Sequence, residues 1–225
     1  DPGYPTYSSV AKLVGAKIET YRMDEHRQWA VDIDELRQRD LTGVKLMWVN
    51  FPHMPTGTLP QRKQLEEIVA FAKANDLLVV HDNPYSFILN DHPASLLSVP
   101  GAKDVVLELN SLSKSHNMAG WRVGMLCASA ERIDEVLRFK SNMDSGMFLP
   151  VQLAAAKALQ LGKDWYDSVN EVYRARREKA FQLLDLLQCR YANGQSGMFV
   201  WARVPAKYDS GYALSDEVLR NAAVF

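Results

Sequence analysis

The chain has 225 residues, of which 47% are hydrophobic and 24% are charged, and its formal net charge at pH 7 is -1. This composition is ordinary for a globular protein with a sizeable core, and the small net charge argues against nucleic acid or an anionic membrane as a partner. The two cysteines, Cys127 and Cys189, form neither a disulfide framework nor a metal-binding pattern. No apolar run of about 18 residues and no signal peptide is visible, so we expect a cytoplasmic location.

Both ends of the sequence suggest an internal fragment of a longer chain. The start, Asp1-Pro2-Gly3-Tyr4-Pro5, is rich in turn residues and lacks an initiator methionine. The last residues, from Ala222 to Phe225, stop within an apolar run.

Strand and helix patterns alternate along most of the chain. Ser8 is expected to cap a short helix that Gly15 ends. Residues 16–23 alternate in polarity, which predicts a strand. Further strands are predicted at residues 44–49, 77–80, 105–109 and 123–128, the last a buried run, and helices at 32–36, 60–74, 131–140, 150–161 and 164–187.

This alternation predicts an α/β fold with a mostly parallel sheet between helices. The long amphipathic helix 164–187 is a plausible domain boundary, and residues 198–201 return to a strand pattern. We therefore expect a large domain at residues 1–162, and at residues 163–225 a connecting helix with the start of a small α+β domain.

Three of the predicted strands end in chemically reactive side chains. Asn50 follows one strand, Asp82 and Tyr85 follow the next, and Ser111 and Lys114 follow a third. Ligands of open α/β sheets gather at the carboxyl ends of strands. A lysine at the end of a buried strand is costly unless it is paired or deprotonated. A deprotonated lysine is a nucleophile for carbonyl groups, so Lys114 is a candidate for Schiff-base chemistry.

An arginine, Arg122, follows Lys114 by eight residues and, with the neighbouring hydroxyl groups, would suit a phosphate. Each of these residues also has an ordinary structural explanation. Lys114 could be solvated, Asp82 could cap a helix or sit in a turn, and Tyr85 could be a core aromatic. Arg122 could pair with a surface carboxylate. Four such residues near successive strand ends are harder to explain by packing alone.

Five motifs in a fixed order then resemble one family. They are Asp-Pro-Gly-Tyr-Pro-x-Tyr from Asp1, Pro-Thr-Gly from Pro55, Asp-x-x-Tyr from Asp82, Ser-x-Ser-Lys-x-x-x-Met-x-Gly-x-Arg-x-Gly from Ser111, and Gly-Met-Phe-x-Trp from Gly197. In this order they resemble the class I/II aminotransferases, the aspartate aminotransferase family of fold-type I pyridoxal-phosphate enzymes. The lysine segment is most similar to the branch that contains LL-diaminopimelate and alanine aminotransferases.

The resemblance implies a role for each matching residue. Lys114 would form the internal aldimine with pyridoxal 5'-phosphate and would later move a proton between substrate and cofactor. Asp82 would pair with the pyridinium nitrogen, and Tyr85 would donate to the 3'-oxygen of the ring. The remaining contacts would come from Ser111 and Arg122, at the phosphate, and from Tyr4, stacked on the pyridine face.

One position departs from the family pattern. The family usually has Asn-Pro-Thr-Gly, whose asparagine also binds the 3'-oxygen, but here Met54 precedes Pro55. A thioether cannot replace an amide donor. The hypothesis is that Tyr85 fills this role, alone or with Asn50.

Other residues have simpler interpretations. His53, His81 and His116 lack metal-ligand spacing and read as core or rim groups, and His81 could support Asp82. Trp121 is expected to pack in the core or at a domain interface.

The resemblance implies ping-pong transfer of an amino group from an amino acid to a 2-oxo acid, within amino acid metabolism, by a homodimer. Alternatives are a carbon–sulfur β-lyase of the same fold and an aminotransferase-like sensor domain of a transcription regulator. The family's upstream phosphate-binding turn and its downstream carboxylate-binding arginine are expected outside these residues. The choice of amino acid depends on residues outside them too.

Overall fold

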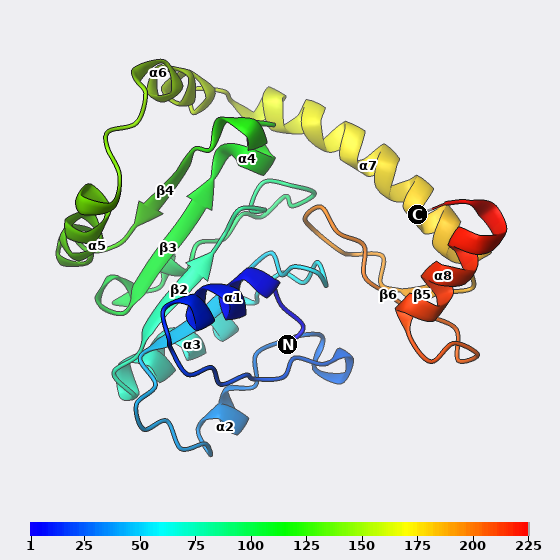
Figure 1. The fold of residues 1–225 in the computed structure, drawn as a ribbon, viewed down its shortest axis with the longest axis horizontal. Coiled ribbons are helices and arrows are strands. Elements are labelled where there is room, and N and C mark those ends of the chain that lie inside the picture. The colour runs from blue at the N-terminus through cyan, green and yellow to red at the C-terminus, as the bar shows by residue number, and fades with distance from the viewer. Residues whose placement is uncertain (225) are drawn as a thin grey trace.

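The centre of the computed structural model, which describes residues 1–224, is a four-stranded sheet in the order β1-β2-β3-β4 (Figure 1). Three strands run parallel, β1 (Leu46–Asn50), β2 (Leu78–Asp82) and β3 (Val106–Ser111), and β4 (Gly124–Cys127) pairs antiparallel to β3. The α/β class and the mixed, mostly parallel sheet are therefore confirmed.

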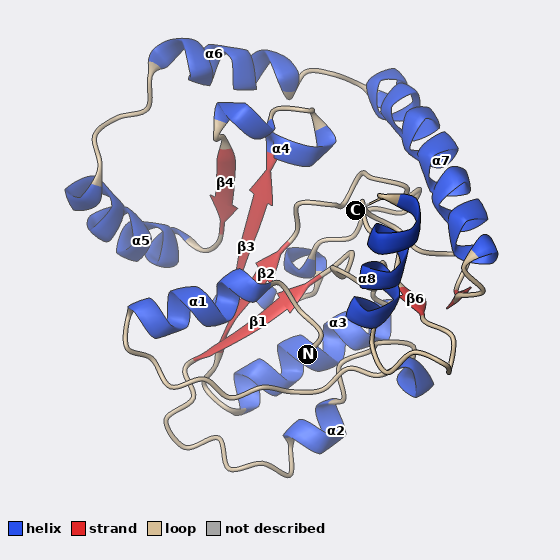
Figure 2. Ribbon diagram, turned by 45° about the vertical axis from the view of Figure 1, so that its right-hand side comes forward, coloured by secondary structure: helices blue, strands red, loops and turns tan. Residues whose placement is uncertain are grey.

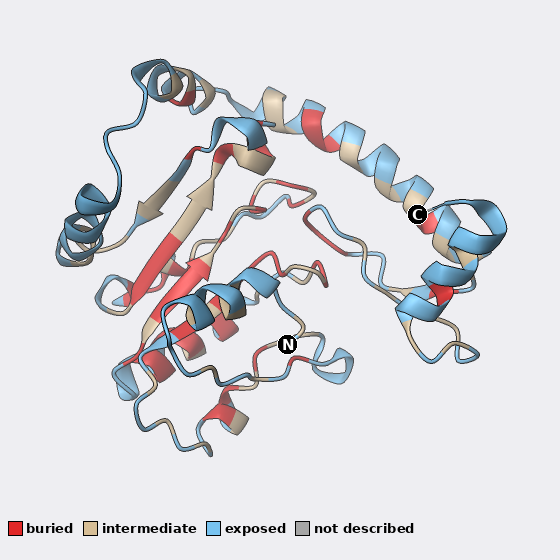
Figure 3. Ribbon diagram, viewed as in Figure 1, coloured by how far each residue is buried: buried red, intermediate tan, exposed pale blue. Residues whose placement is uncertain are grey.

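The two faces of the sheet carry different neighbours because side chains alternate along each strand. The helix α3 (Arg62–Ala74) packs its apolar face on one side, where Ile68 and Ala72 meet Val79 in the main core. On the other side lies α1 (Pro5–Leu13), whose Tyr7 ring stacks on Trp48 at 4.6 Å. Figure 3 shows that burial is concentrated in the sheet and α3.

The second half of the chain is mostly helical (Figure 2). Two exposed helices, α5 (Ala130–Met143) and α6 (Leu149–Ala158), lead to the 24-residue α7 (Lys163–Leu186). Beyond α7 lie a two-stranded sheet, β5 (Arg190–Tyr191) with β6 (Ala202–Arg203), and α8 (Gly211–Ala222). The remaining elements are the short helices α2 (Ile33–Leu36) and α4 (Leu112–Ser115) and the 3-10 turns η1 (Glu25–Arg27), η2 (Leu96–Ser98), η3 (Ala102–Asp104) and η4 (Ala119–Trp121).

Two predicted strands are wrong. Residues 16–23 form no strand, although Met23 is buried and the Tyr21 hydroxyl donates to the Trp48 carbonyl at 2.6 Å. Residues 198–201 also form none. There the Gln195 side-chain amide donates to the Trp201 carbonyl and accepts from the Trp201 N–H. The Trp201 backbone groups are therefore already bonded and do not pair with a neighbouring strand.

Three smaller predictions are also wrong. Helix α1 begins at Pro5, so Ser8 lies inside it and caps nothing, because proline suits the first helical turn. Trp121 is 50% exposed, since the η4 turn buries its neighbours Met118 and Val123 instead. The predicted buried run at residues 123–128 contains β4, which is only partly buried because it lies at the edge of the sheet.

Within the described residues, no helix has the length and apolar character needed to cross a membrane.

Candidate active site

The parallel register gathers the predicted residues at one edge of the sheet. Asn50 at the end of β1 pairs in register with Asp82 at the end of β2, and Asp82 pairs with Leu109 of β3. Ser111 ends β3 and leads directly into α4, which carries Lys114. The strand ends named from the sequence therefore lie next to one another at one edge of the sheet, where ligands of such sheets gather.

Asp82 is held by a residue that the sequence did not single out. The Tyr7 hydroxyl donates to Asp82 Oδ2 at 2.6 Å, while Oδ1 accepts no hydrogen bond from residues 1–224. Burial raises the pKa of Asp82, and the bond from Tyr7 and the charge of His81 partly offset this. The free oxygen suits a cationic ring nitrogen. Tyr4, 45% exposed, meets the Tyr7 ring edge-on at 5.5 Å.

Tyr85 lies close enough to Asp82 for the carboxylate charge to change the pKa of the Tyr85 hydroxyl. Burial, then the charges of Asp82 and Tyr4, raise the pKa of Tyr85 to about 12. Its hydroxyl therefore stays protonated and can donate a hydrogen bond near neutral pH. The ring meets Phe199 edge-on at 5.9 Å, so the Gly-Met-Phe motif lies against it.

Lys114 is half-buried on α4, and its amine has no hydrogen bond or ion pair with any described residue. The helix begins where the Ser111 hydroxyl accepts a hydrogen bond from the Ser113 N–H at 3.0 Å. The helix is anchored from the other side by Trp165 of α7, whose Nε1 donates to the Ser115 carbonyl at 2.9 Å. The turn is thus fixed, and the amine is available.

Arg122 returns beside Ser111 because β4 pairs with β3. The Ser111 hydroxyl donates to the Val123 carbonyl at 3.4 Å, one residue from Arg122. Arg122 is exposed, has φ +54°, and donates only to the carbonyl of Ala119 at 2.9 Å among residues 1–224. The surface ion pair considered from the sequence is therefore absent from the described chain, and the guanidinium can take an anion.

Asn50 has a structural role in the loop after β1. Its Nδ2 donates to the backbone carbonyl of Asp82 at 2.7 Å, and its Oδ1 accepts from the Met54 N–H at 2.7 Å. The amide oxygen and one of the two amide N–H groups are thus engaged with backbone. Tyr85, alone or with the second N–H of Asn50, stays the predicted donor to the 3'-oxygen.

Gly57 explains the Pro-Thr-Gly motif. It has φ +70°, and a Cβ there would come within 2.7 Å of the Gln195 Cβ. The Ser196 N–H donates to the Gly57 carbonyl at 2.8 Å. The motif therefore lets the loop after β1 lie close against residues 195–196.

The residues present fit a phosphorylated aromatic aldehyde. Within residues 1–224 they offer an amine with no hydrogen bond or ion pair, a partly buried carboxylate with one free oxygen, a protonated phenol and an arginine without a carboxylate partner. The sequence analysis gave Tyr7 no role, although it ends the Asp-Pro-Gly-Tyr-Pro-x-Tyr motif and follows Tyr4 by three residues. No group of three or more His, Cys, Asp or Glu side chains in residues 1–224 could hold a metal ion.

Comparison with known proteins identifies relatives of the whole chain. Residues 1–225 match the family described as aminotransferase class I and II. The LL-diaminopimelate aminotransferases of Dehalococcoides mccartyi strain 195 and Moorella thermoacetica are each 36% identical over 226 residues, which cover 100% of this chain and 58% of each relative. The chain thus spans less than two thirds of these relatives' length.

Solved structures agree with the fold. Apo-BacF from Bacillus subtilis superimposes with a TM-score of 0.92 at 31% identity, over 99% of this chain and 57% of that one. An aminotransferase from Staphylococcus aureus gives 0.90 at 26% identity, over 100% of this chain and 60% of that one.

Proposed function

Because the chain belongs to the class I and II aminotransferases, we propose that the protein uses pyridoxal phosphate to transfer an amino group from an amino acid to a 2-oxo acid. The transfer would be ping-pong, with the amino acid and the 2-oxo acid reacting in turn. The observation that carries the proposal is the unpartnered Lys114 amine at the sheet edge that also holds Asp82.

The cofactor, when bound, supplies an electron sink that stabilises a carbanion at the substrate Cα. Asp82 would hold the ring nitrogen in its protonated form through its free oxygen, while Tyr7 fixes the other oxygen. Tyr85 would donate to the ring oxygen, since the pKa of its hydroxyl is about 12. Lys114 would hold the aldehyde carbon and would later move the proton at the substrate Cα.

The phosphate group would be held at the start of α4. Arg122 offers a charge-assisted fork, and the Ser111 hydroxyl lies beside it. Tyr4 covers the ring face. The similarity to LL-diaminopimelate aminotransferases supports that branch, and the substrate is an amino acid whose identity the remaining chain decides.

The proposal also covers the organisation of the protein. Residues 1–162 belong to a large cofactor-binding domain, and residues 163–225 contain the connecting helix and the start of a small domain. The protein works as a cytoplasmic homodimer, as the resemblance implies.

The absorbance spectrum of the full natural chain tests the function. Added pyridoxal phosphate should give a visible band that an amino acid abolishes, with formation of pyridoxamine phosphate, and a 2-oxo acid should restore it. Lys114→Ala should lose the covalent band, and Lys157→Ala, on exposed α6, is the matched control. A visible band that persists in Lys114→Ala would disprove the assignment.

The same experiment separates the related β-lyase reaction. Release of pyruvate and ammonia from a β-substituted amino acid, without pyridoxamine phosphate, would replace the transaminase proposal by the lyase. A band that forms but responds to no amino acid would favour the sensor domain.

A further inference from the structure

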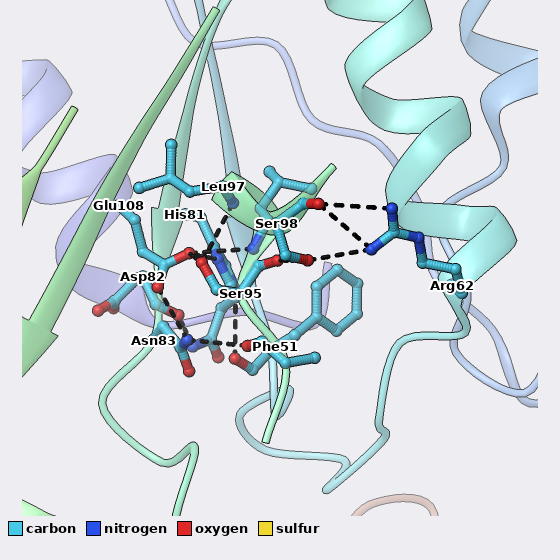
Figure 4. Close-up of polar contacts among 12 residues, drawn as sticks. Phe51, Arg62, His81, Asp82, Asn83, Ser95, Leu97, Ser98 and Glu108 are labelled. Atoms are coloured by element: carbon cyan, nitrogen blue, oxygen red, sulfur yellow. Dashed lines mark hydrogen bonds and ion pairs between the residues drawn. The ribbon is translucent and has the colours of Figure 1, made fainter. Parts of the chain in front are cut away.

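A buried polar cluster lies on the face of the sheet opposite to the Asp82 side chain (Figure 4). Its centre is His81, one residue before Asp82 on β2, and Glu108, its register partner on β3. Because neighbouring strand residues point to opposite faces, His81 lies on the α3 side. His81 and Glu108 are only 1% and 6% exposed.

Glu108 accepts hydrogen bonds from four donors. Its Oε2 accepts from His81 Nδ1 at 2.9 Å, the Ser95 hydroxyl at 2.7 Å and the Leu96 N–H at 3.0 Å. Its Oε1 accepts from Asn83 Nδ2 at 3.2 Å. Burial by itself would raise the pKa of Glu108, but His81, Ser95 and Asn83 together lower it. The side chain is therefore a carboxylate that needs a counter-charge.

His81 supplies that charge. Its Nε2 lies 3.2 Å from the Phe51 carbonyl, which can only accept, and its Nδ1 faces the Glu108 carboxylate, which also only accepts. Hydrogen on both ring nitrogens, as in an imidazolium, is the arrangement that would satisfy both acceptors. The pair joins the segment after β1 to β2 and β3. The η2 turn lies against the pair, and a hydrogen bond from Arg62 to the Ser98 hydroxyl holds this turn in place.

We propose that the buried His81–Glu108 ion pair is a positioning element that keeps the Asp82 carboxylate ionised and correctly placed from the reverse face of the sheet. A buried ion pair is seldom worth its desolvation cost as a stabilising device. Here the His81 ring is adjacent in sequence to Asp82, the partly buried carboxylate that the proposed function needs in charged form. Only the expected effect on cofactor binding rests on the proposed function.

The first test uses the cofactor-free full chain, so it does not depend on the function. With ¹⁵N-labelled histidine, both ring nitrogens of His81 should give signals of the protonated ring at pH 7, assigned by their loss in His81→Gln. With ¹³C-labelled aspartate, the Asp82 carboxyl should titrate at higher pH in His81→Gln than in the natural chain. A neutral His81 ring, or an unchanged Asp82 titration, would overturn the inference.

The second test measures the dissociation constant of pyridoxal phosphate. Loss of a residue that supports a ligand-binding side chain weakens binding about tenfold or more in well-studied metal sites, and we expect about tenfold in His81→Gln at pH 7. The double variant His81→Gln/Glu108→Gln keeps hydrogen-bonding groups without either charge, so it covers the case in which an unpaired Glu108 unfolds the single variant. It should also bind about tenfold more weakly.

Val79→Ala is the matched control, since Val79 lies on the same strand and face and is fully buried but carries no charge. It should lower stability while leaving the Asp82 titration and the cofactor affinity unchanged. If it weakens binding as much as His81→Gln does, the pair is merely structural. If the natural chain binds no pyridoxal phosphate, the proposed function fails, and the titration of Asp82 still decides the inference.

Discussion

His53 gives the protein a pH-dependent stability of its own. It is 5% exposed, and its Nδ1 lies 2.7 Å from the Thr56 hydroxyl. Burial lowers the pKa of His53 from 6.5 to about 4. Between these values the unfolded chain binds a proton that the folded chain does not, so stability falls as pH falls. Over this window the loss amounts to about 3 kcal/mol.

The variant His53→Asn, which retains a hydrogen-bonding group, should remove this dependence. Free energies of unfolding from urea titrations at pH 7 and pH 4.5 would measure it, with the exposed His26 changed to Asn as the control. Equal slopes against pH for the natural chain and His53→Asn would contradict the prediction.

Tyr85 should set the titration of the bound cofactor. Because Met54 offers no donor and the Asn50 amide already binds backbone through its oxygen and one N–H, we expect the Tyr85 hydroxyl to stabilise negative charge on the ring oxygen. In Tyr85→Phe the pH at which the visible absorbance changes should therefore move upward. Tyr4→Phe, which also loses one hydroxyl, should leave that midpoint in place. An unchanged midpoint in Tyr85→Phe would count against the assigned role.

Among the elements, α7 contacts residues 87–89, which follow Tyr85, through the Asn170 side chain and through Tyr166, whose ring stacks on Phe87 at 4.7 Å. Asn170 is 7% exposed, donates to the Phe87 carbonyl at 3.0 Å and accepts from the Leu89 N–H at 2.8 Å. Asn170→Ala leaves both backbone groups without a partner, which should cost about 2–4 kcal/mol. Thermal or urea unfolding would measure it. The exposed Asn142→Ala should change stability by less than about 0.5 kcal/mol. An equally small effect at Asn170 would show that water replaces both bonds.

The sequence predicted most elements because burial patterns are local. The strands at Leu46–Asn50, Leu78–Asp82 and Val106–Ser111 are apolar runs that end in polar residues. Residues 16–23 have an alternating pattern that also suits a strand but pair with no other strand, and pairing cannot be read from one segment.

The site residues were also predictable only where the signal was local in the sequence. The strand-end residues were visible as motifs, whereas the Tyr7–Asp82 contact joins residues 75 positions apart and the His81–Glu108 pair joins residues 27 apart. Such contacts depend on the register of the sheet and on the position of α1. The sequence alone specifies neither.

The molecule as a whole carries an uncovered apolar strip on α5, α6 and the loop between them. Figure 3 shows both helices largely exposed, and α5 buries no residue at all. The strip consists of Phe139, Met143, Phe148, Leu149 and Leu153, each between 61% and 72% exposed. Exposed apolar side chains in such number favour association in water. We therefore expect a polypeptide of residues 1–225 to self-associate with rising concentration.

Polar substitution of the strip should weaken that association. The triple variant Phe139→Ser/Phe148→Ser/Leu153→Ser removes the largest exposed side chains from both helices and from the loop, at positions where no core contact is lost. Sedimentation velocity over a range of concentrations should show a lower average mass for the variant than for the natural sequence. Tyr212→Ser is the matched control, because Tyr212 is 85% exposed but lies on α8, apart from the strip. If Tyr212→Ser lowers the mass as much as the triple variant, association does not depend on α5 and α6.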